Sequence, residues 1–404
     1  MNKAPRYVFL FVILYGIIFV FGYIANIKGV VYPLINTEFG LSDEQQGMMV
    51  SLLGMGNVLF SFIGGILIGS IGVKKTFIAG FLFVFTGLVT VFFVSRFLSV
   101  AGALFIMFAG FGFFHVSSNA LAAQLFKVRT ALLMTLLHFS FGLGSIISPR
   151  VAGTLAANLS WRYAYLFSIP LVLLLFVPAL FTRFPGSTQE NPSAKKISFF
   201  TALKTPEVWV FSVVLGLMMV VEISSINWAG LYFQNVYGLD PKTSGAAFLS
   251  NFFILFTLSR LLSGFVIDKI GYVRCLFIAA LASIFTLTLG FGMGERGIYI
   301  LPALGFFTAV FFPITMVTAM GYFREDAPVM ISAVIVIAGA LNSGMQLLIG
   351  VINSLAGPAW GYRSVLVYAV LVAAALLVLR RYIRRPYKDL PVEQEEKGVR
   401  TQEV

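Results

Sequence analysis

The sequence predicts an all-α membrane protein in which twelve transmembrane helices form two pseudo-symmetric six-helix bundles, with both termini in the cytoplasm. The first observation is composition: 59% of the 404 residues are apolar and only 11% are charged, whereas soluble domains have about 45–50% apolar and about 25% charged residues. The second is that apolar segments long enough to cross about 30 Å of hydrocarbon recur along the whole chain. The third is an internal repeat.

Charges, glycines and prolines separate the apolar segments into twelve predicted spans. Several exceed the roughly 20 residues that a perpendicular helix needs, so tilted or kinked helices are expected. Internal prolines at Pro33, Pro149, Pro170, Pro302 and Pro313 support kinks. The predicted spans are 8–36, 46–71, 75–94, 98–126, 129–157, 161–183, 206–237, 243–270, 273–293, 297–324, 327–356 and 362–385.

The distribution of basic residues predicts the orientation. Most of the 28 lysines and arginines lie in loops on the side of the N-terminus, and Arg380 and Arg381 lie at the end of the last span. The positive-inside rule therefore places both termini in the cytoplasm of a multi-pass plasma-membrane protein, as in a bacterial inner membrane. The net charge of +12 then indicates contact with anionic lipid, and no nucleic-acid partner is expected.

A polar stretch near the middle of the chain predicts the domain boundaries. Residues 1–183 form the N-terminal bundle, 184–205 a cytoplasmic linker, 206–386 the C-terminal bundle, and 387–404 a disordered tail.

The two predicted bundles contain matching segments. Phe39–Gly47 resembles Tyr237–Gly245 at an offset of 198 residues, and Gly65–Lys75 resembles Gly264–Arg274 at an offset of 199. Two parallel halves related by an axis along the membrane normal place a cavity between them near mid-membrane, which is reached alternately from each side.

The second copy of this repeat carries a family motif. Gly264, Asp268, Gly271 and Arg274 form a G-x3-D-x2-G-x2-R turn that resembles the signature loop of the major facilitator superfamily, and Gly69 replaces the usual Asp in the first copy. The resemblance extends over nearly the entire chain. It implies a secondary transporter that works by alternating access, without a cofactor.

Three shorter motifs resemble the fucose and glucose permease branch of that superfamily. They are Glu222-x4-Asn227-Trp228-x3-Tyr232, the stretch from Leu137 to Pro149, and Phe312-Pro313-Ile314-Thr315. This resemblance implies symport of a sugar or polyol with protons. That branch has an acidic residue near the position of Gly29. This chain departs from the branch there, because the adjacent residue is Lys28.

Ionisable groups inside a span are candidate functional residues, because each costs at least about 2.5–3.5 kcal/mol at the helix centre. Glu222, midway along the seventh span, is the candidate proton-coupling residue, and Lys28 in the first span is a candidate substrate ligand and partner for it. His115 and His138 are candidates for substrate or proton handling. The alternatives are an interfacial Lys28, a structural Glu222 and histidines that only pack.

Polar and aromatic side chains complete the predicted substrate site. Amides match hydroxyl groups as donors and acceptors, and aromatic rings stack on sugars. The alternatives are hydrogen bonding between helices and ordinary packing. The candidates are Asn119, Asn227, Trp228, Tyr232, Asn251, Asn342 and Gln346.

Four further charged residues are predicted to act in gates or structure: Arg150, Arg260, Asp268 and Arg274. Arg260 and Asp268 are expected near the inner end of the eighth span.

Other chemistry is not expected. The single Cys275 and two histidines offer no disulfide and no cysteine-ligated metal site, and no G-x4-G-K-[ST] loop for ATP occurs. The predicted partners are a small-molecule substrate, protons and the bilayer, and the predicted oligomeric state is a monomer. The alternatives to sugar symport are an organic-anion uniporter, symporter or exchanger that uses Lys28, an exporter of amphiphilic drugs or lipids suggested by the Phe-rich spans, and an intramembrane enzyme, which we do not expect.

Overall fold

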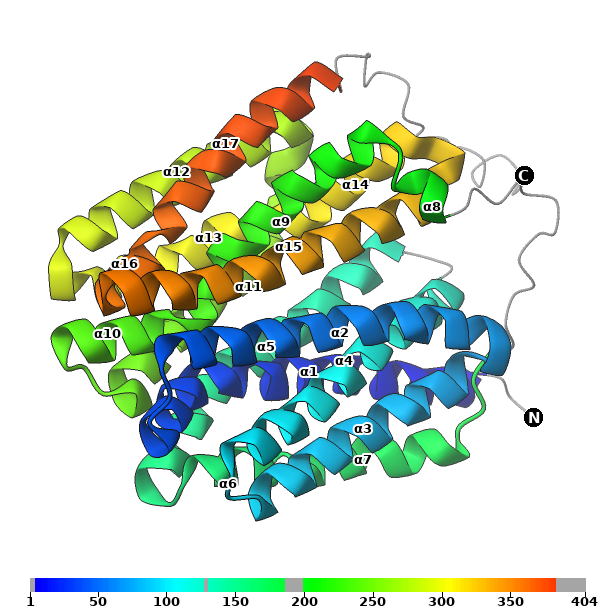
Figure 1. Ribbon diagram of the computed structural model, residues 1–404. Helices are drawn as coiled ribbons and strands as arrows, with labels where there is room; N and C mark the ends of the chain where they lie inside the picture. The colour runs from blue at the N-terminus through cyan, green and yellow to red at the C-terminus, as the bar shows by residue number, and fades with distance from the viewer. Residues whose placement is uncertain (1–3, 127–129, 186–198, 383–404) are drawn as a thin grey trace.

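The computed structural model describes residues 4–126, 130–185 and 199–382. Its described elements are all helical, as expected for a backbone that must satisfy its hydrogen bonds inside lipid. Helices α1 to α7 lie together in the lower part of Figure 1, α9 and α11 to α17 lie together in the upper part, and α10 lies at the left, next to the lower group. We call these groups the N-terminal and C-terminal halves.

The N-terminal half holds four long unbroken helices besides α1, a short α6 and the final α7. The helices are α1 (Ala4–Phe39), α2 (Asp43–Ile71), α3 (Val73–Phe93), α4 (Phe97–Leu125), α5 (Thr130–Asn158), α6 (Trp161–Leu166) and α7 (Ile169–Phe181).

The C-terminal half has more interruptions. A short α8 (Phe199–Ala202) precedes it, and its elements are α9 (Pro206–Asn227), α10 (Ala229–Tyr237), the π-helical turn η1 (Pro241–Gly245), α11 (Ala246–Ile270), α12 (Tyr272–Gly292), the 3-10 turns η2 (Gly294–Tyr299) and η3 (Leu301–Ala303), α13 (Leu304–Thr308), α14 (Phe311–Phe323), the 3-10 turn η4 (Arg324–Asp326), α15 (Ala327–Ala356), α16 (Pro358–Arg363) and α17 (Val365–Tyr382).

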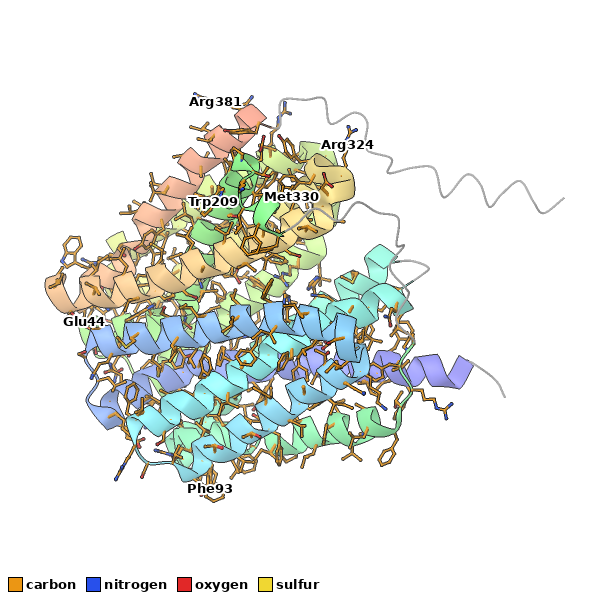
Figure 2. All side chains as sticks on the ribbon, turned by 45° about the vertical axis from the view of Figure 1, so that its right-hand side comes forward. Glu44, Phe93, Trp209, Arg324, Met330 and Arg381 are labelled. Atoms are coloured by element: carbon orange, nitrogen blue, oxygen red, sulfur yellow. The ribbon has the colours of Figure 1, made fainter. Side chains whose placement is uncertain are left out.

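Within the described residues, 11 helical segments are long and apolar enough to cross a membrane. The remaining predicted span corresponds to α5, part of which lies outside the described residues that this count covers. Helix α5 packs against both α1 and α11. Figure 2 places Glu44 at one end of the bundle and Arg324 and Arg381 toward the other.

The backbone repeats where the sequence repeats. Gly72 and Gly271 each end one helix and begin the next, with φ of 85° at both. Gly40 and Gly238 have φ of 58° and 69° at the opposite helix ends. These left-handed conformations favour glycine, so the two halves share both their turn residues and their turn geometry.

Only some of the internal prolines interrupt their helices. The chain breaks between α6 and α7 before Pro170, and between α13 and α14 before Pro313. Pro33 and Pro149, in contrast, lie within continuous α1 and α5. A proline lacks the N–H that would bond the carbonyl four residues earlier, so the loss of this single bond leaves α1 and α5 unbroken.

The halves contact each other through α2 with α15 and through α5 with α11. Close backbone contacts between the halves lie toward the ends of α1 and α10 that are expected to face the exterior. A Cβ at Gly47 would lie 3.1 Å from the Cα of Gly350, and one at Gly153 would lie 2.2 Å from the carbonyl oxygen of Lys242. The structure is therefore closed on the expected outer side.

The predicted linker 184–205 and tail 387–404 fall largely or wholly outside the described residues. The division into two bundles with these boundaries stays a prediction.

Candidate functional site

Ionisable side chains from both halves form a central cluster, which we define as Lys28, His115, His138, Glu222 and Arg260. They come from α1, α4, α5, α9 and α11. Charge interactions link Glu222 to Arg260 and then to Lys28, and link His138 to Arg260 and His115. All five are half-buried, and within the described chain no protein group hydrogen-bonds to Lys28, Glu222 or either histidine.

Helix packing explains why these groups meet. Gly29, next to Lys28, lies against α9, where a Cβ would be 2.8 Å from the carbonyl oxygen of Ile226, one turn after Glu222. Gly142 of α5 likewise lies against α11, where an added Cβ would be 2.1 Å from Oγ1 of Thr257. His138 and Arg260 are each about one turn further along these same two helices. Glycines thus bring the charged residues of opposite halves together.

Aromatic rings support the two cations. The Nζ atom of Lys28 lies 5.3 Å from the centre of the Phe108 ring, and the guanidinium carbon of Arg260 lies 4.4 Å from that of Phe256. These are cation–π distances. The direct ion pair of the described residues joins Arg162 to Glu38 at 2.8 Å, so Lys28 and Glu222 interact over a longer separation.

Arg260 lies deeper than expected for an inner gate, because it interacts with Glu222 and His138 instead of lying at the inner helix end. Asp268 belongs to α11, and its side chain is outside the described part. Arg274 is exposed at the start of α12, and Arg150 is exposed on α5.

A second polar group, the amide network, lies within the C-terminal half. The Nε1 atom of Trp228 donates to Oε1 of Gln346 at 2.9 Å. The Nε2 atom of Gln346 donates to Oγ of Ser224 at 3.1 Å and to Oδ1 of Asn342 at 3.2 Å. These buried bonds join α9 to α15. Trp228 also marks the break between α9 and α10.

The other predicted site residues of the seventh span are also buried. Asn227 is 1% exposed, and its Oδ1 has no hydrogen-bond partner. Tyr232 shares a hydrogen bond with Tyr237 at 3.3 Å and packs against the ring of Tyr362 at 5.3 Å. These contacts place Tyr232 among aromatic side chains at the expected outer end of the C-terminal half, and its predicted part in a substrate site stays a prediction.

The two remaining predicted amides differ in their surroundings. Asn119 is exposed one turn after His115, on the same face of α4. Asn251 is exposed together with Ile254 and Leu258. It is nine residues before Arg260, which at 3.6 residues per turn is the opposite side of α11. Asn251 therefore lies apart from the central cluster.

Sequence reasoning missed several polar contacts. Asn26 donates to Oγ of Ser145 at 3.0 Å and ties α1 to α5. Glu38 accepts from both Arg162 and Trp161. Asn26 could have been chosen from the sequence, because it is an amide inside an apolar span. The partner of Glu38 could not, because it depends on how two helix ends that are distant in the sequence meet.

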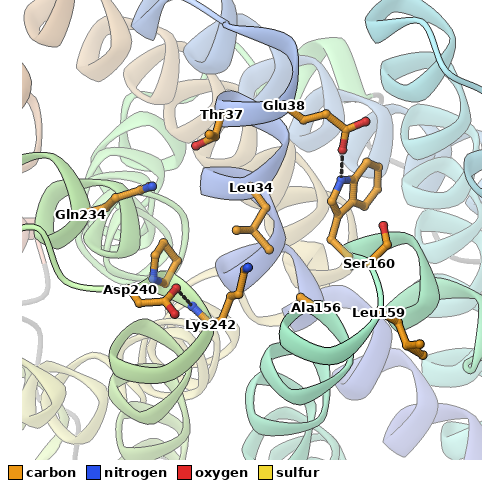
Figure 3. Close-up of a pocket in the computed structure, with 11 residues that line it drawn as sticks. Leu34, Thr37, Glu38, Ala156, Leu159, Ser160, Gln234, Asp240 and Lys242 are labelled. Carbon is orange, nitrogen blue, oxygen red and sulfur yellow. Dashed lines mark hydrogen bonds between the residues drawn. The ribbon is translucent and has the colours of Figure 1, made fainter.

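A surface cavity of about 400 Å³ lies between helix ends of the two halves on the closed, expected outer side. Leu34 and Glu38 come from α1, Gln234 from α10, and Asp240 and Lys242 from the turn that leads into α11 (Figure 3). This cavity is separate from the central cluster. Among the described residues, no group of three His, Cys, Asp or Glu side chains could hold a metal ion.

Comparison with known proteins explains this architecture. The family model for the Major Facilitator Superfamily matches residues 14–345. The chain belongs to the major facilitator superfamily. Members of this superfamily are membrane transporters of small molecules, and this chain is a multi-pass membrane protein of that type, which fits the plasma membrane.

Similar proteins give the family resemblance more detail. A TsgA homologue of Buchnera aphidicola is 22% identical over 74% of this chain and 77% of its own length. A candidate glucose/galactose transporter of Helicobacter pylori is 23% identical over 82% of this chain and 86% of its own. The solved fucose:proton symporter FucP of E. coli has the same superfamily fold, with a TM-score of 0.66, 17% identity, and coverage of 94% and 100% of the two chains.

Proposed function

We propose that this major facilitator is a proton-coupled secondary transporter that carries a small polar solute by alternating access, as a monomer. The central cluster carries this proposal. Five ionisable groups would each be costly in a membrane, and they come from both halves. Groups on opposite halves are those whose separation changes when the halves rock against each other.

Glu222 is the proposed proton-coupling residue. It lies between Arg260 of its own half and Lys28 of the opposite half. Because a nearby cation favours the charged form of a carboxylate, movement of Lys28 relative to Glu222 would alter its affinity for protons. Proton binding and helix movement would thus depend on each other.

A sugar or polyol is the first candidate solute. The names of two similar proteins, a glucose/galactose transporter and a fucose:proton symporter, support it. Asn342 and Gln346 would supply donors and acceptors for hydroxyl groups if the amide network opened during the cycle. In the present state these amides bond to Trp228 and to one another.

An organic anion is the second candidate. It is favoured by a specific feature of the central cluster, which has two basic side chains, Lys28 and Arg260, and a single carboxylate, Glu222.

Proton movement in proteoliposomes tests the proposed function. We expect that glucose, galactose, fucose, polyols or small carboxylates added outside include a solute that makes the outer medium alkaline as protons enter with it. Glu222→Gln should abolish this proton movement, and Glu295→Gln, an exposed residue outside the cluster, should not. Solute uptake without proton movement, or proton movement that persists in Glu222→Gln, would contradict the proposal.

A further inference from the structure

The central cluster contains two cations and a single carboxylate. Lys28 and Arg260 come from opposite halves and both interact with the same carboxylate, Glu222. In the described chain neither forms a direct ion pair or a hydrogen bond, and the Nε atom of Arg260 is enclosed without an acceptor. Because a single carboxylate only partly compensates two cations, the site favours a further anion.

The surroundings position the two cations for an anionic ligand. Phe108 lies beside Lys28 and Phe256 beside Arg260, and both rings are buried. A guanidinium binds a carboxylate through two parallel hydrogen bonds, and an ammonium adds a compact point charge. A carboxylate between these groups would bridge the N-terminal and C-terminal halves.

We propose that the solute is a small organic monocarboxylate, which binds between Lys28 and Arg260 after Glu222 has taken up a proton. This rests on the proposed proton-coupled function and names its substrate class. In the empty state, the Glu222 carboxylate partly neutralises both cations. A proton from the outer solution binds to a Glu222 carboxylate oxygen, and the solute's carboxylate then replaces the lost negative charge.

The charges balance in this scheme. The empty site, with Lys28 and Arg260 positive and Glu222 negative, has a net charge of one positive unit. The loaded site has two cations, neutral Glu222 and one anion, which gives the same net charge.

The titratable neighbours of the site are few among the described groups. His138 faces Arg260 and His115, and the charged residues that face Glu222 are Arg260 and Lys28. Symport of one proton with one monocarboxylate would therefore move no net charge.

Ligand protection of the purified full-length protein tests the binding site. Cys275, the single cysteine, is buried, so a thiol-reactive dye reports unfolding. The probes are gluconate, lactate and pyruvate, with glucose, sorbitol and glycerol as neutral counterparts. We expect a monocarboxylate to raise the unfolding temperature by several degrees. The shift should disappear in Lys28→Gln and Arg260→Gln and stay in Arg296→Gln, an exposed control.

Glu222→Gln separates this inference from the general proposal. This variant carries no competing carboxylate, so monocarboxylate protection should persist in it and depend less on pH than in the wild-type protein. Protection by neutral sugars alone, or protection by carboxylates that survives in both Lys28→Gln and Arg260→Gln, would overturn the inference. Proton-coupled transport of a neutral solute would then still support the proposed function.

Transport measurements test the charge balance independently of variant folding. In wild-type proteoliposomes, uptake of the protective monocarboxylate should follow an imposed pH gradient and should not change when a potassium diffusion potential is imposed with valinomycin. Uptake driven by that potential would refute the exchange of the Glu222 charge for the solute charge.

Discussion

The side chain of Gln346 uses both ends of its amide within the C-terminal half. Its oxygen accepts from Trp228, and its nitrogen donates to Ser224 and Asn342. Because all of these groups are buried, the loss of Gln346 would leave the indole N–H without an acceptor.

Gln346→Leu should therefore reduce the free energy of unfolding by about 1–3 kcal/mol, the cost of an unsatisfied buried polar group. Labelling of Cys275 during heating measures the change. The matched control is Asn251→Leu, which replaces an exposed amide and should change stability by less than about 0.5 kcal/mol. Equal losses in the two variants would show that the network contributes nothing specific.

These two amides also show what the sequence can predict for single residues. Both Asn251 and Gln346 stand out as polar groups in apolar spans, and for that reason both were predicted to bind substrate. Helical spacing relates residues on one helix, so the opposite placement of Asn251 and Arg260 on α11 could have been recognised. The partners of Gln346 could not, because they depend on how α9 packs against α15.

At the scale of helices, glycines determine how closely α1 and α5 approach. A Cβ at Gly144 would lie 2.1 Å from the carbonyl oxygen of Phe19, and one at Gly22 would lie 2.2 Å from that of Phe141. The clashing atoms belong to the backbone, which cannot move aside as a flexible side chain can. Asn26 and Ser145 add a hydrogen bond in the same contact.

Gly144→Val should accordingly destabilise the protein by about 1–3 kcal/mol, as overpacking does. Gly102→Val is the control, since a Cβ at that helical position meets no atom within 4 Å. We expect the unfolding temperature to fall in the first variant and to stay nearly constant in the second. A similar fall in both would indicate that loss of helical glycine, and not the close α1–α5 contact, is responsible.

The hydropathy of the sequence predicted where helices form, but the positions of the prolines alone did not predict where helices are interrupted. Pro33 and Pro149 lie in continuous helices, whereas the seventh span breaks at Trp228, without a proline. A proline removes one donor, and whether the helix then breaks depends on how neighbouring helices accommodate the freed carbonyl. This information is tertiary.

For the whole molecule, the repeat in the sequence predicts two similar halves, and the matching turns at Gly72 and Gly271 agree with it. The repeat does not predict which side of the transporter is closed. That property depends on contacts between residues of opposite halves, such as Gly47 with Gly350. Two arrangements of the same halves can differ by only a few kcal/mol.

Gly350→Val should shift the protein toward a state that is open on the expected outer side. A Cβ at Gly350 would lie 2.5 Å from the carbonyl oxygen of Asp43 and 3.0 Å from the Cα of Gly47, so the added side chain opposes closure of α2 against α15. A penalty of about 1–3 kcal/mol corresponds to a 5- to 150-fold change in the ratio of the two states.

Leu249→Cys in a Cys275→Ser background reports this shift. Leu249 is fully buried on α11 and packs across the halves against Gly29 of α1. A membrane-impermeant thiol reagent added from outside should label Leu249→Cys several-fold faster when Gly350→Val is present. Gly344→Val, at a position of the same helix where a Cβ meets no atom within 4 Å, should leave the labelling rate unchanged. Unchanged labelling with Gly350→Val would mean that the contact between Gly47 and Gly350 does not hold the outer side closed.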